Sequence, residues 1–134
     1  MNKPAIVAAL LTLATATAAP AADVENGQKV FKKCQACHEV GPDAKNKVGP
    51  ILNNIFGRTA GTQADFVSKY SKAMIDAGAR GLMWTEETVE HYIEKPKDFV
   101  AKNKMAFAGL KKEEDRDDVI AYLLQFSPDY KPAE

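Results

Sequence analysis

The sequence has 134 residues, the length of a single domain, and 46% of them are hydrophobic, which suffices for a compact core. Its formal net charge is +0, from 18 basic and 18 acidic residues. Because the sequence also has no long basic run, its charge argues against a protein that attracts nucleic acid through a positive field.

The beginning of the chain has the pattern of an export signal. Lys3 is followed by an apolar run without charge, residues 5–14, which is short for a membrane span. Ala19-Pro20-Ala21 then fits the small-residue specificity of signal peptidase. We therefore expect residues 1–21 to be a cleaved signal peptide and 22–134 to form one domain in the periplasm. An uncleaved anchoring segment is the alternative.

The first predicted helix begins after Asp23, a favoured N-cap residue, and its apolar positions recur at spacings of three and four. This helix leads into the sequence Cys34-Gln35-Ala36-Cys37-His38. A disulfide between the two cysteines would close a very small loop and would add little stability. A zinc site would need His91 as its fourth ligand, and the chain lacks the βαβ pattern of a thioredoxin-like redox site.

The remaining interpretation of this motif is attachment of a c-type haem. In such a site the two thiols form thioether bonds to the haem, and the histidine behind them coordinates the iron. Cys34, Cys37 and His38 are therefore predicted to hold one covalent haem c with its iron.

The middle of the chain alternates between loops and short helices. Residues 41–61 are rich in Gly, Pro and Asn, which predicts a loop with a turn near 52–56. A short helix is expected near 70–77, closed by Gly78. A further helix is expected from the N-cap Thr85 up to Pro96, with Val89, Tyr92 and Ile93 facing inward.

The last predicted helix spans about 112–126, because Val119, Tyr122, Leu123 and Phe126 follow one helical stripe. The proline-containing tail after it is expected to be loose. No segment alternates as a strand does, so the predicted fold class is all-α, with long loops wrapped around the haem.

Three methionines and one histidine are candidates for the second axial ligand of the iron. His91 is expected to face water, Met74 to fill a gap in a helix interface, and Met83 to belong to the core beside Trp84. Met105 lies in a loop among lysines, between two predicted helices, and has little packing reason to be there. We therefore predict His38 and Met105 as the axial ligands.

The sequence resembles the class I cytochromes c, in particular the soluble bacterial kind similar to mitochondrial cytochrome c. The resemblance covers the whole chain after the export signal and rests on the haem motif, Val48-Gly49-Pro50, Phe56-Gly57-Arg58, Tyr70-Ser71-Lys72-Ala73 and the end of the last helix, 117–123. It implies that Gly27 and Phe31 cross the last helix near Tyr122.

The resemblance also assigns roles around the haem. It implies that the Pro50 carbonyl accepts the ring N–H of the proximal histidine, and that Tyr92 touches the methionine sulfur. It further implies that Arg58, Tyr70 and Trp84 bind a haem propionate. Asn103 stands where the family has a threonine with the same task, so Asn103 is also predicted to bind the cofactor.

The methionine loop departs from the family pattern Pro-Gly-Thr-Lys-Met, because this chain has Ala101-Lys102-Asn103-Lys104-Met105. Loss of the proline removes a conformational restraint. We predict that a lysine displaces the methionine at a lower pH than in relatives that keep the proline.

The resemblance implies a monomeric electron carrier rather than an enzyme. A haem peroxidase or a gas-binding sensor with a displaceable methionine is the alternative, and a haem-free helical domain with a Cys34–Cys37 disulfide is a further one. The expected partners are membrane redox complexes, with a quinol-oxidising cytochrome complex as donor and a terminal oxidase as acceptor. They would dock at lysines around the haem edge, namely Lys33, Lys45, Lys47, Lys95, Lys97, Lys102, Lys104, Lys111 and Lys112.

Overall fold

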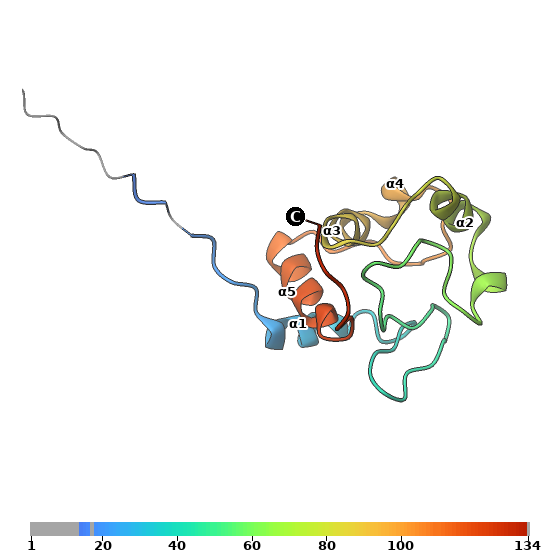
Figure 1. The fold of residues 1–134 in the computed structure, drawn as a ribbon, viewed down its shortest axis with the longest axis horizontal. Helices are drawn as coiled ribbons and strands as arrows, with labels where there is room; N and C mark the ends of the chain where they lie inside the picture. Colours follow the sequence, from blue (N-terminus) through green and yellow to red (C-terminus); the bar gives the residue numbers. More distant parts are fainter. Residues whose placement is uncertain (1–13, 17, 134) are drawn as a thin grey trace, which may run out of the picture.

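The computed structural model describes residues 14–16 and 18–133. Over these residues the chain is helical, with no β-strand beyond an isolated bridge between Thr59 and Met83, so the predicted all-α class is confirmed (Figure 1). No helix in the described part of the chain is long and apolar enough to cross a membrane. The elements in order are α1 (Val24–Phe31), the 3₁₀ helix η1 (Val67–Lys69), α2 (Lys72–Ala79), α3 (Glu86–Glu94), α4 (Pro96–Phe99) and α5 (Glu113–Leu124).

Most of the predicted signal peptide, residues 1–13 and 17, lies outside the described residues. Residues 14–16 and 18–22 are exposed and belong to no helix. Helix α1 begins directly after them, where the Asp23 side chain accepts a hydrogen bond from the amide of Asn26, as predicted for an N-cap.

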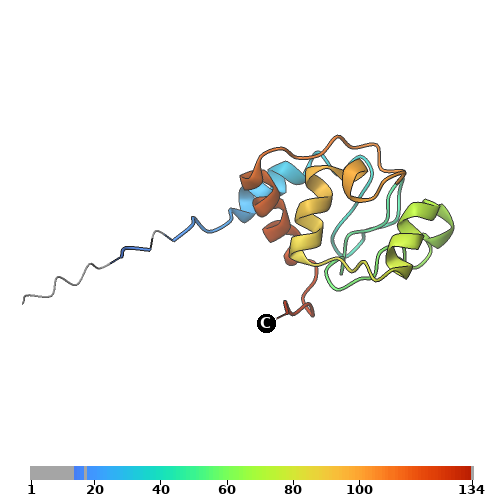
Figure 2. The ribbon, with the colours of Figure 1, turned by 90° about the horizontal axis from the view of Figure 1, so that it is seen from above.

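Helices α1 and α5 lie side by side in close contact (Figures 1 and 2), and Gly27 is where their backbones approach most closely. A Cβ atom added to Gly27 would lie 1.9 Å from the carbonyl oxygen of Asp118, so a larger residue does not fit there. The rings of Phe31 and Tyr122 meet beside it, with centroids 5.4 Å apart. The carboxylate of Asp118 accepts hydrogen bonds from the Asp23 amide at 2.6 Å and the Asn26 side chain at 2.7 Å. The crossing implied by the family resemblance is confirmed.

Helix α2 does not end where the sequence predicted. Gly78 lies inside the helix, which continues to Ala79, so its role as a helix terminator is wrong. It is buried against the loop, because an added Cβ would lie 1.9 Å from the carbonyl oxygen of Ala60. Close approach of the two backbones, rather than helix termination, therefore requires a glycine here.

Helix α3 begins at its predicted cap, where the side chains of Thr85 and Thr88 each bond the other's backbone amide. Val89 and Tyr92 are buried and Ile93 is half-buried, as expected. Pro96 ends this helix and also begins α4, which the sequence pattern did not predict. A proline suits the first helical position, because its missing N–H would have no partner there.

The tail after α5 is not loose up to Tyr130, contrary to expectation. The carbonyl of Phe126 accepts a hydrogen bond from the amide of Asn54 at 2.8 Å, and Ser127 is buried. The ring of Tyr130 packs on Phe56 with centroids 5.5 Å apart. This segment therefore fixes the predicted loop 41–61 against the end of α5.

The core joins α1, α3 and α5 to the loop that follows the cysteine motif. Its buried members include Phe31, Ile55, Trp84 and Val119. Cys34 and Met105 are partly buried and pack against this same core, although they lie far apart in the sequence. The fold therefore brings the cysteine motif and the methionine loop to one interior region.

Candidate functional site

The cysteine motif continues the helical path beyond α1. The amide of Cys34 donates to the Phe31 carbonyl at 2.8 Å, and the amide of His38 donates to the Cys34 carbonyl at 2.9 Å. One helical turn therefore separates Cys34 from His38 and places them on the same side. Cys34 and Cys37 are free, partly buried thiols, and burial raises the pKa of Cys34 to about 11. A thiol with so high a pKa is a poor nucleophile at neutral pH, which argues against a thiol–disulfide redox site.

The imidazole of His38 is oriented by the loop that follows it. Its Nδ1 lies 2.7 Å from the carbonyl oxygen of Pro50. Since a carbonyl accepts and does not donate, Nδ1 carries the proton and Nε2 keeps a free lone pair. Burial lowers the pKa of His38, which keeps the ring neutral at neutral pH. A neutral ring with a free Nε2 is the form that binds a metal.

Gly49 forms one wall against this imidazole. A Cβ atom added to it would lie 2.4 Å from Cε1 and 2.8 Å from Nδ1 of His38. The sequence showed this glycine as part of a family motif, but gave no sign that its lack of a side chain makes room for the ring.

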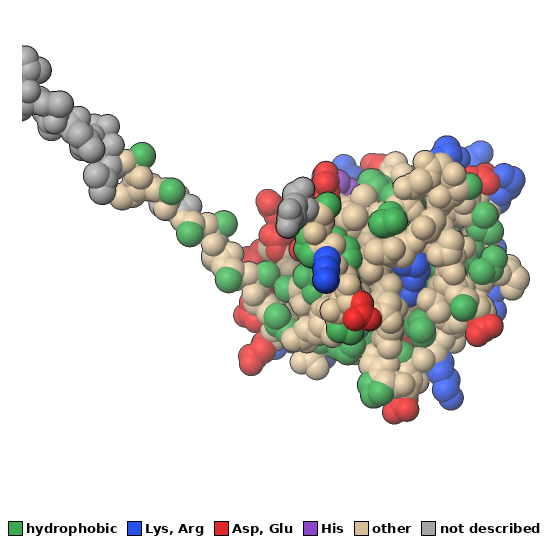
Figure 3. All heavy atoms as spheres, viewed as in Figure 1, with side chains coloured by type: hydrophobic (Ala, Val, Ile, Leu, Met, Phe, Trp, Pro, Cys, Tyr) green, Lys and Arg blue, Asp and Glu red, His purple; other side chains and the backbone are tan. Residues whose placement is uncertain are grey.

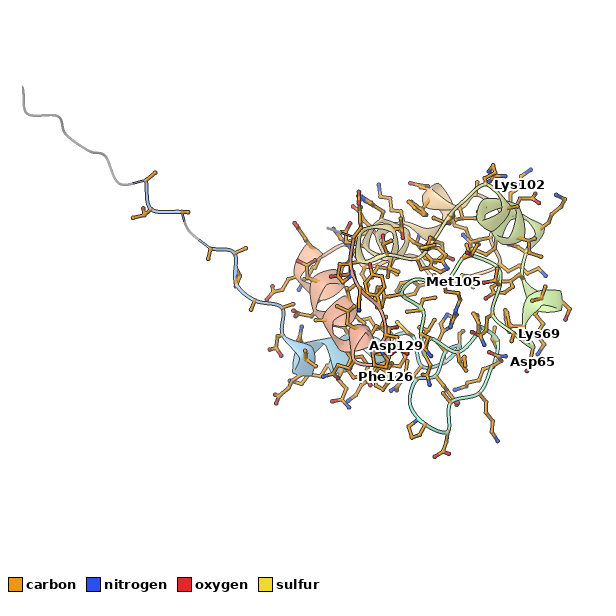
Figure 4. All side chains as sticks on the ribbon, in the orientation of Figure 1. Asp65, Lys69, Lys102, Met105, Phe126 and Asp129 are labelled. Atoms are coloured by element: carbon orange, nitrogen blue, oxygen red, sulfur yellow. The ribbon has the colours of Figure 1, made fainter. Side chains whose placement is uncertain are left out.

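The Met105 side chain lies in the interior of the globular part, whereas Lys102 of the same loop lies at its edge (Figure 4). The sulfur of Met105 is 3.7 Å from the hydroxyl of Tyr92, the contact that the resemblance implied. Burial raises the pKa of that hydroxyl well above its usual range, so it remains a hydrogen-bond donor. Met105 lies near His38, the other predicted ligand.

The other candidate ligands lie in different surroundings. Met74 is buried in the core, as predicted for a gap-filling residue. The ring of His91 is exposed and 3.3 Å from the carboxylate of Glu90, also as predicted. Met83 is 47% exposed, so its interpretation as a core residue is wrong.

The loop after the cysteine motif carries a partly buried arginine, Arg58. The Arg58 guanidinium donates to the carbonyls of Ile51 at 3.1 Å and Asn53 at 2.6 Å. The Tyr70 hydroxyl lies beside this guanidinium, whose charge acts to lower the pKa of Tyr70 against the larger effect of burial. Arg58 has no carboxylate partner among the ion pairs of the described residues. Its remaining N–H donors fit an external carboxylate.

The last two predicted cofactor contacts, Trp84 and Asn103, are both buried. The Trp84 ring is 6% exposed and lies 4.9 Å from the ring of Tyr92, centroid to centroid. The Asn103 side chain is hydrogen bonded to the carbonyls of Pro96 and Val100 and to the amide of Met105. Its predicted contact with a propionate stays a prediction.

Together these groups fit a covalently bound haem. Two free thiols lie three residues apart, a neutral imidazole follows the second, and an arginine without a carboxylate partner among the described residues lies in the facing loop. The thioether of Met105 is a soft ligand of the kind that c-type cytochromes pair with histidine. The fold and the site thus define the class of single-haem electron carriers.

Comparison with known proteins agrees with this class. The family model described as "Cytochrome c" matches residues 24–127. Cytochrome c2 of Afifella marina is 53% identical over 81% of this chain and 86% of that protein. Cytochrome c2 of Agrobacterium tumefaciens is 50% identical over 84% of this chain and 98% of that protein. The solved structure of cytochrome c2 from Rhodospirillum centenum superposes with a TM-score of 0.74 at 45% identity, covering 79% of this chain and 99% of that one.

The chain belongs to the class I cytochromes c, within the cytochrome c2 family. It is therefore an electron carrier and not an enzyme. Its haem is attached covalently through the motif formed by Cys34, Cys37 and His38.

Proposed function

We propose that this protein carries one electron at a time between membrane redox complexes of the periplasm, with His38 and Met105 as the axial ligands of its haem iron. The observation that carries the proposal is that a neighbouring group forms a hydrogen bond to each of the two proposed ligand side chains and orients it. The Pro50 carbonyl holds His38 with Nε2 free, and the Tyr92 hydroxyl donates toward the Met105 sulfur. When bound, the haem supplies an iron that gains and loses one electron.

The chain contributes position, polarity and exclusion of water. Trp84, Tyr92 and Phe31 are buried around the site and exclude solvent from it. An apolar site and a thioether ligand disfavour the more positively charged, oxidised state, so the midpoint potential is expected to be fairly high. With both axial positions taken by protein side chains, no position is left for a substrate.

Arg58 and Tyr70 are proposed to bind a haem propionate. Arg58 has two of its five N–H donors satisfied by backbone carbonyls, and the Tyr70 hydroxyl lies beside it. Trp84 remains a proposed member of this group. A carboxylate bound here would be charge-paired and partly shielded from solvent.

The protein is proposed to act as a monomer and to dock through the exposed lysines near the methionine loop. On the face shown in Figure 3, acidic side chains gather at the edge of α1 and α5, and a group of basic side chains lies at the opposite edge by α2. A positive rim attracts an acidic partner and orients it during approach. A quinol-oxidising cytochrome complex as donor and a terminal oxidase as acceptor fit this scheme. The exposed lysines of this region are Lys95, Lys97, Lys102, Lys104, Lys111 and Lys112.

Export is also part of the proposal. A leader over residues 1–21 and a single haem domain over 22–134 agree with a family match that begins at residue 24. Sequencing of the N-terminus of the protein recovered from the periplasm tests this assignment, and recovery of the uncleaved chain from the membrane would contradict it.

The axial ligands are tested by optical spectra of the wild type, of Met105→Ala and of the matched control Met83→Ala. The wild type is expected to show covalent c-type haem bands and the weak methionine-to-iron band. Met105→Ala is expected to lose that band and to have a lower midpoint potential, whereas Met83→Ala keeps both because Met83 is exposed. An unchanged spectrum in Met105→Ala would overturn the ligand assignment.

Two further measurements separate electron transfer from the alternatives. Carbon monoxide that binds readily to the reduced wild type would favour a gas-binding or peroxidase function instead. The rate of electron transfer to a membrane oxidase is expected to fall steeply as ionic strength rises, because salt screens the lysine rim. A rate independent of salt would overturn docking by charge.

A further inference from the structure

The segment between α4 and the methionine ligand forms a tight turn. The amide of Asn103 donates to the Val100 carbonyl at 3.2 Å, and Lys102 has a φ of 64°. A four-residue turn with a positive φ at its third position corresponds to type II, in which proline and glycine are preferred at the second and third positions. Here these positions carry Ala101 and Lys102, so the turn lacks the residues that normally stabilise it.

The buried side chain of Asn103 stabilises this turn in place of the missing proline and glycine. It is 5% exposed, and its amide nitrogen donates to the Pro96 and Val100 carbonyls, both at 2.8 Å. Its amide oxygen accepts the backbone N–H of Met105 at 2.8 Å. One buried side chain therefore ties the first residue of α4, the residue after α4 and the proposed iron ligand together.

Lys97 supports the same residue from the solvent side. Its ammonium group donates to the carbonyl of Asn103 and lies 3.5 Å from the Asn103 side-chain oxygen. These bonds oppose rotation of the Asn103 peptide and of its side chain. A cation held in this way is also less free to meet a docking partner than the other lysines of the rim.

We infer that Asn103 is a positioning residue for the haem: its side chain holds Met105 on the iron in a loop that lacks the family's proline. This inference rests on the proposed ligation by Met105. Both N–H donors of the amide are used within the protein, so the group acts on Met105 and not on a propionate. An asparagine is suited to this because it combines two donors with an acceptor, which neither threonine nor aspartate does.

The test measures how easily an added ligand displaces the methionine. Ferric protein is titrated with imidazole, and the methionine-to-iron band is recorded for the wild type, Asn103→Ala and the control Lys29→Ala. We expect Asn103→Ala to bind imidazole at least about tenfold more tightly and to show a weaker band, since it loses the three hydrogen bonds that hold the Met105 segment. Lys29→Ala, which removes an exposed lysine of α1 outside these contacts and outside the docking lysines, is expected to stay within about twofold of the wild type.

A rescue variant separates positioning from general stability. Ala101→Pro is compatible with the fold, because Val100 has φ −124° and ψ 89°, which suits a residue before proline. In the Asn103→Ala background it is expected to return the imidazole affinity to within about threefold of wild type, by restraining the turn through the backbone. Ala101→Pro alone is expected to weaken imidazole binding, which keeps the test possible if Asn103→Ala does not fold.

The outcomes are distinct. If Asn103→Ala lowers the unfolding midpoint but leaves the imidazole affinity and the band unchanged, Asn103 is merely structural and the inference is overturned. If it does not fold and Ala101→Pro alone fails to weaken imidazole binding, the inference is overturned as well. If the wild type has no methionine-to-iron band, the proposed ligation by Met105 fails instead.

Discussion

Gly49→Ala probes how closely the loop approaches the proximal histidine. The added Cβ would lie 2.4 Å from Cε1 of His38, and contacts below 3.0 Å are essentially never seen for Cβ atoms. The ring or the loop must therefore move by at least 0.6 Å, the difference between these two distances. A displacement of that size would stretch the Nδ1–Pro50 bond from 2.7 Å to about 3.3 Å, beyond the usual range.

Two effects follow from this displacement. Crowding in a packed site costs about 1–3 kcal/mol of folding free energy. Loss of the bond to Pro50 makes the imidazole a poorer electron donor to the iron, which disfavours the oxidised state. A bond of ~1 kcal/mol corresponds to about 40 mV for one electron, so the midpoint potential is expected to rise by up to that amount.

Gly41→Ala is the matched control. Gly41 has a φ of 112° and nothing within 4 Å of an added Cβ, so its substitution strains the backbone without touching the histidine. Gly41→Ala is expected to lower the free energy of unfolding by about 1 kcal/mol and to leave the midpoint potential unchanged. The assays are denaturant unfolding of the haem-loaded protein and redox titration. If Gly49→Ala has the potential and stability of the wild type, the close approach of the glycine to the ring has no energetic role.

Three further predictions concern other parts of the molecule. Gly27→Ala is expected to lower the free energy of unfolding by about 1–3 kcal/mol, despite the helix propensity of alanine, because α1 and α5 must separate; unchanged denaturant unfolding would contradict this. The buried Tyr92 hydroxyl titrates above the 10.0 of an exposed tyrosine, so folding stability is full below that pH and falls by about 1.4 kcal/mol per unit above it. In unfolding experiments at several pH values, Tyr92→Phe is expected to lack the part of the stability loss that comes from this hydroxyl. Lysine is expected to displace Met105 at higher pH once Ala101→Pro and Lys102→Gly restore the family's turn, as an alkaline titration of the methionine band would show.

The fold class and the haem motif could be predicted from the sequence because their signals are local. Cys34, Cys37 and His38 lie within about one helical turn, so their spacing alone specifies a shared side. The caps Asp23 and Thr85 act on amides three residues away, which the sequence also displays. Met105 could be singled out because an apolar side chain in a polar loop has no local explanation.

The close contacts between distant segments could not be predicted, because they depend on which part of the backbone the fold places next to a given residue. Gly78 has the pattern of a helix end, yet the Ala60 carbonyl packs against it inside α2. The tail after α5 is polar and rich in turn residues, yet Asn54 and Phe56 hold it in place. In each case the partner is a backbone group or ring that is distant in the sequence, and the local composition of a segment does not reveal such a partner.

The sequence by itself determined that this chain binds a haem covalently and that its helices have the caps and stripes of an all-α domain. The tertiary structure decided how the proposed ligands are held: a carbonyl for His38, a tyrosine hydroxyl for Met105, and a buried asparagine for the turn that precedes Met105. The reason is physical. Attachment chemistry needs residue types at a fixed spacing, whereas orientation needs hydrogen-bond partners that meet only when distant segments pack together.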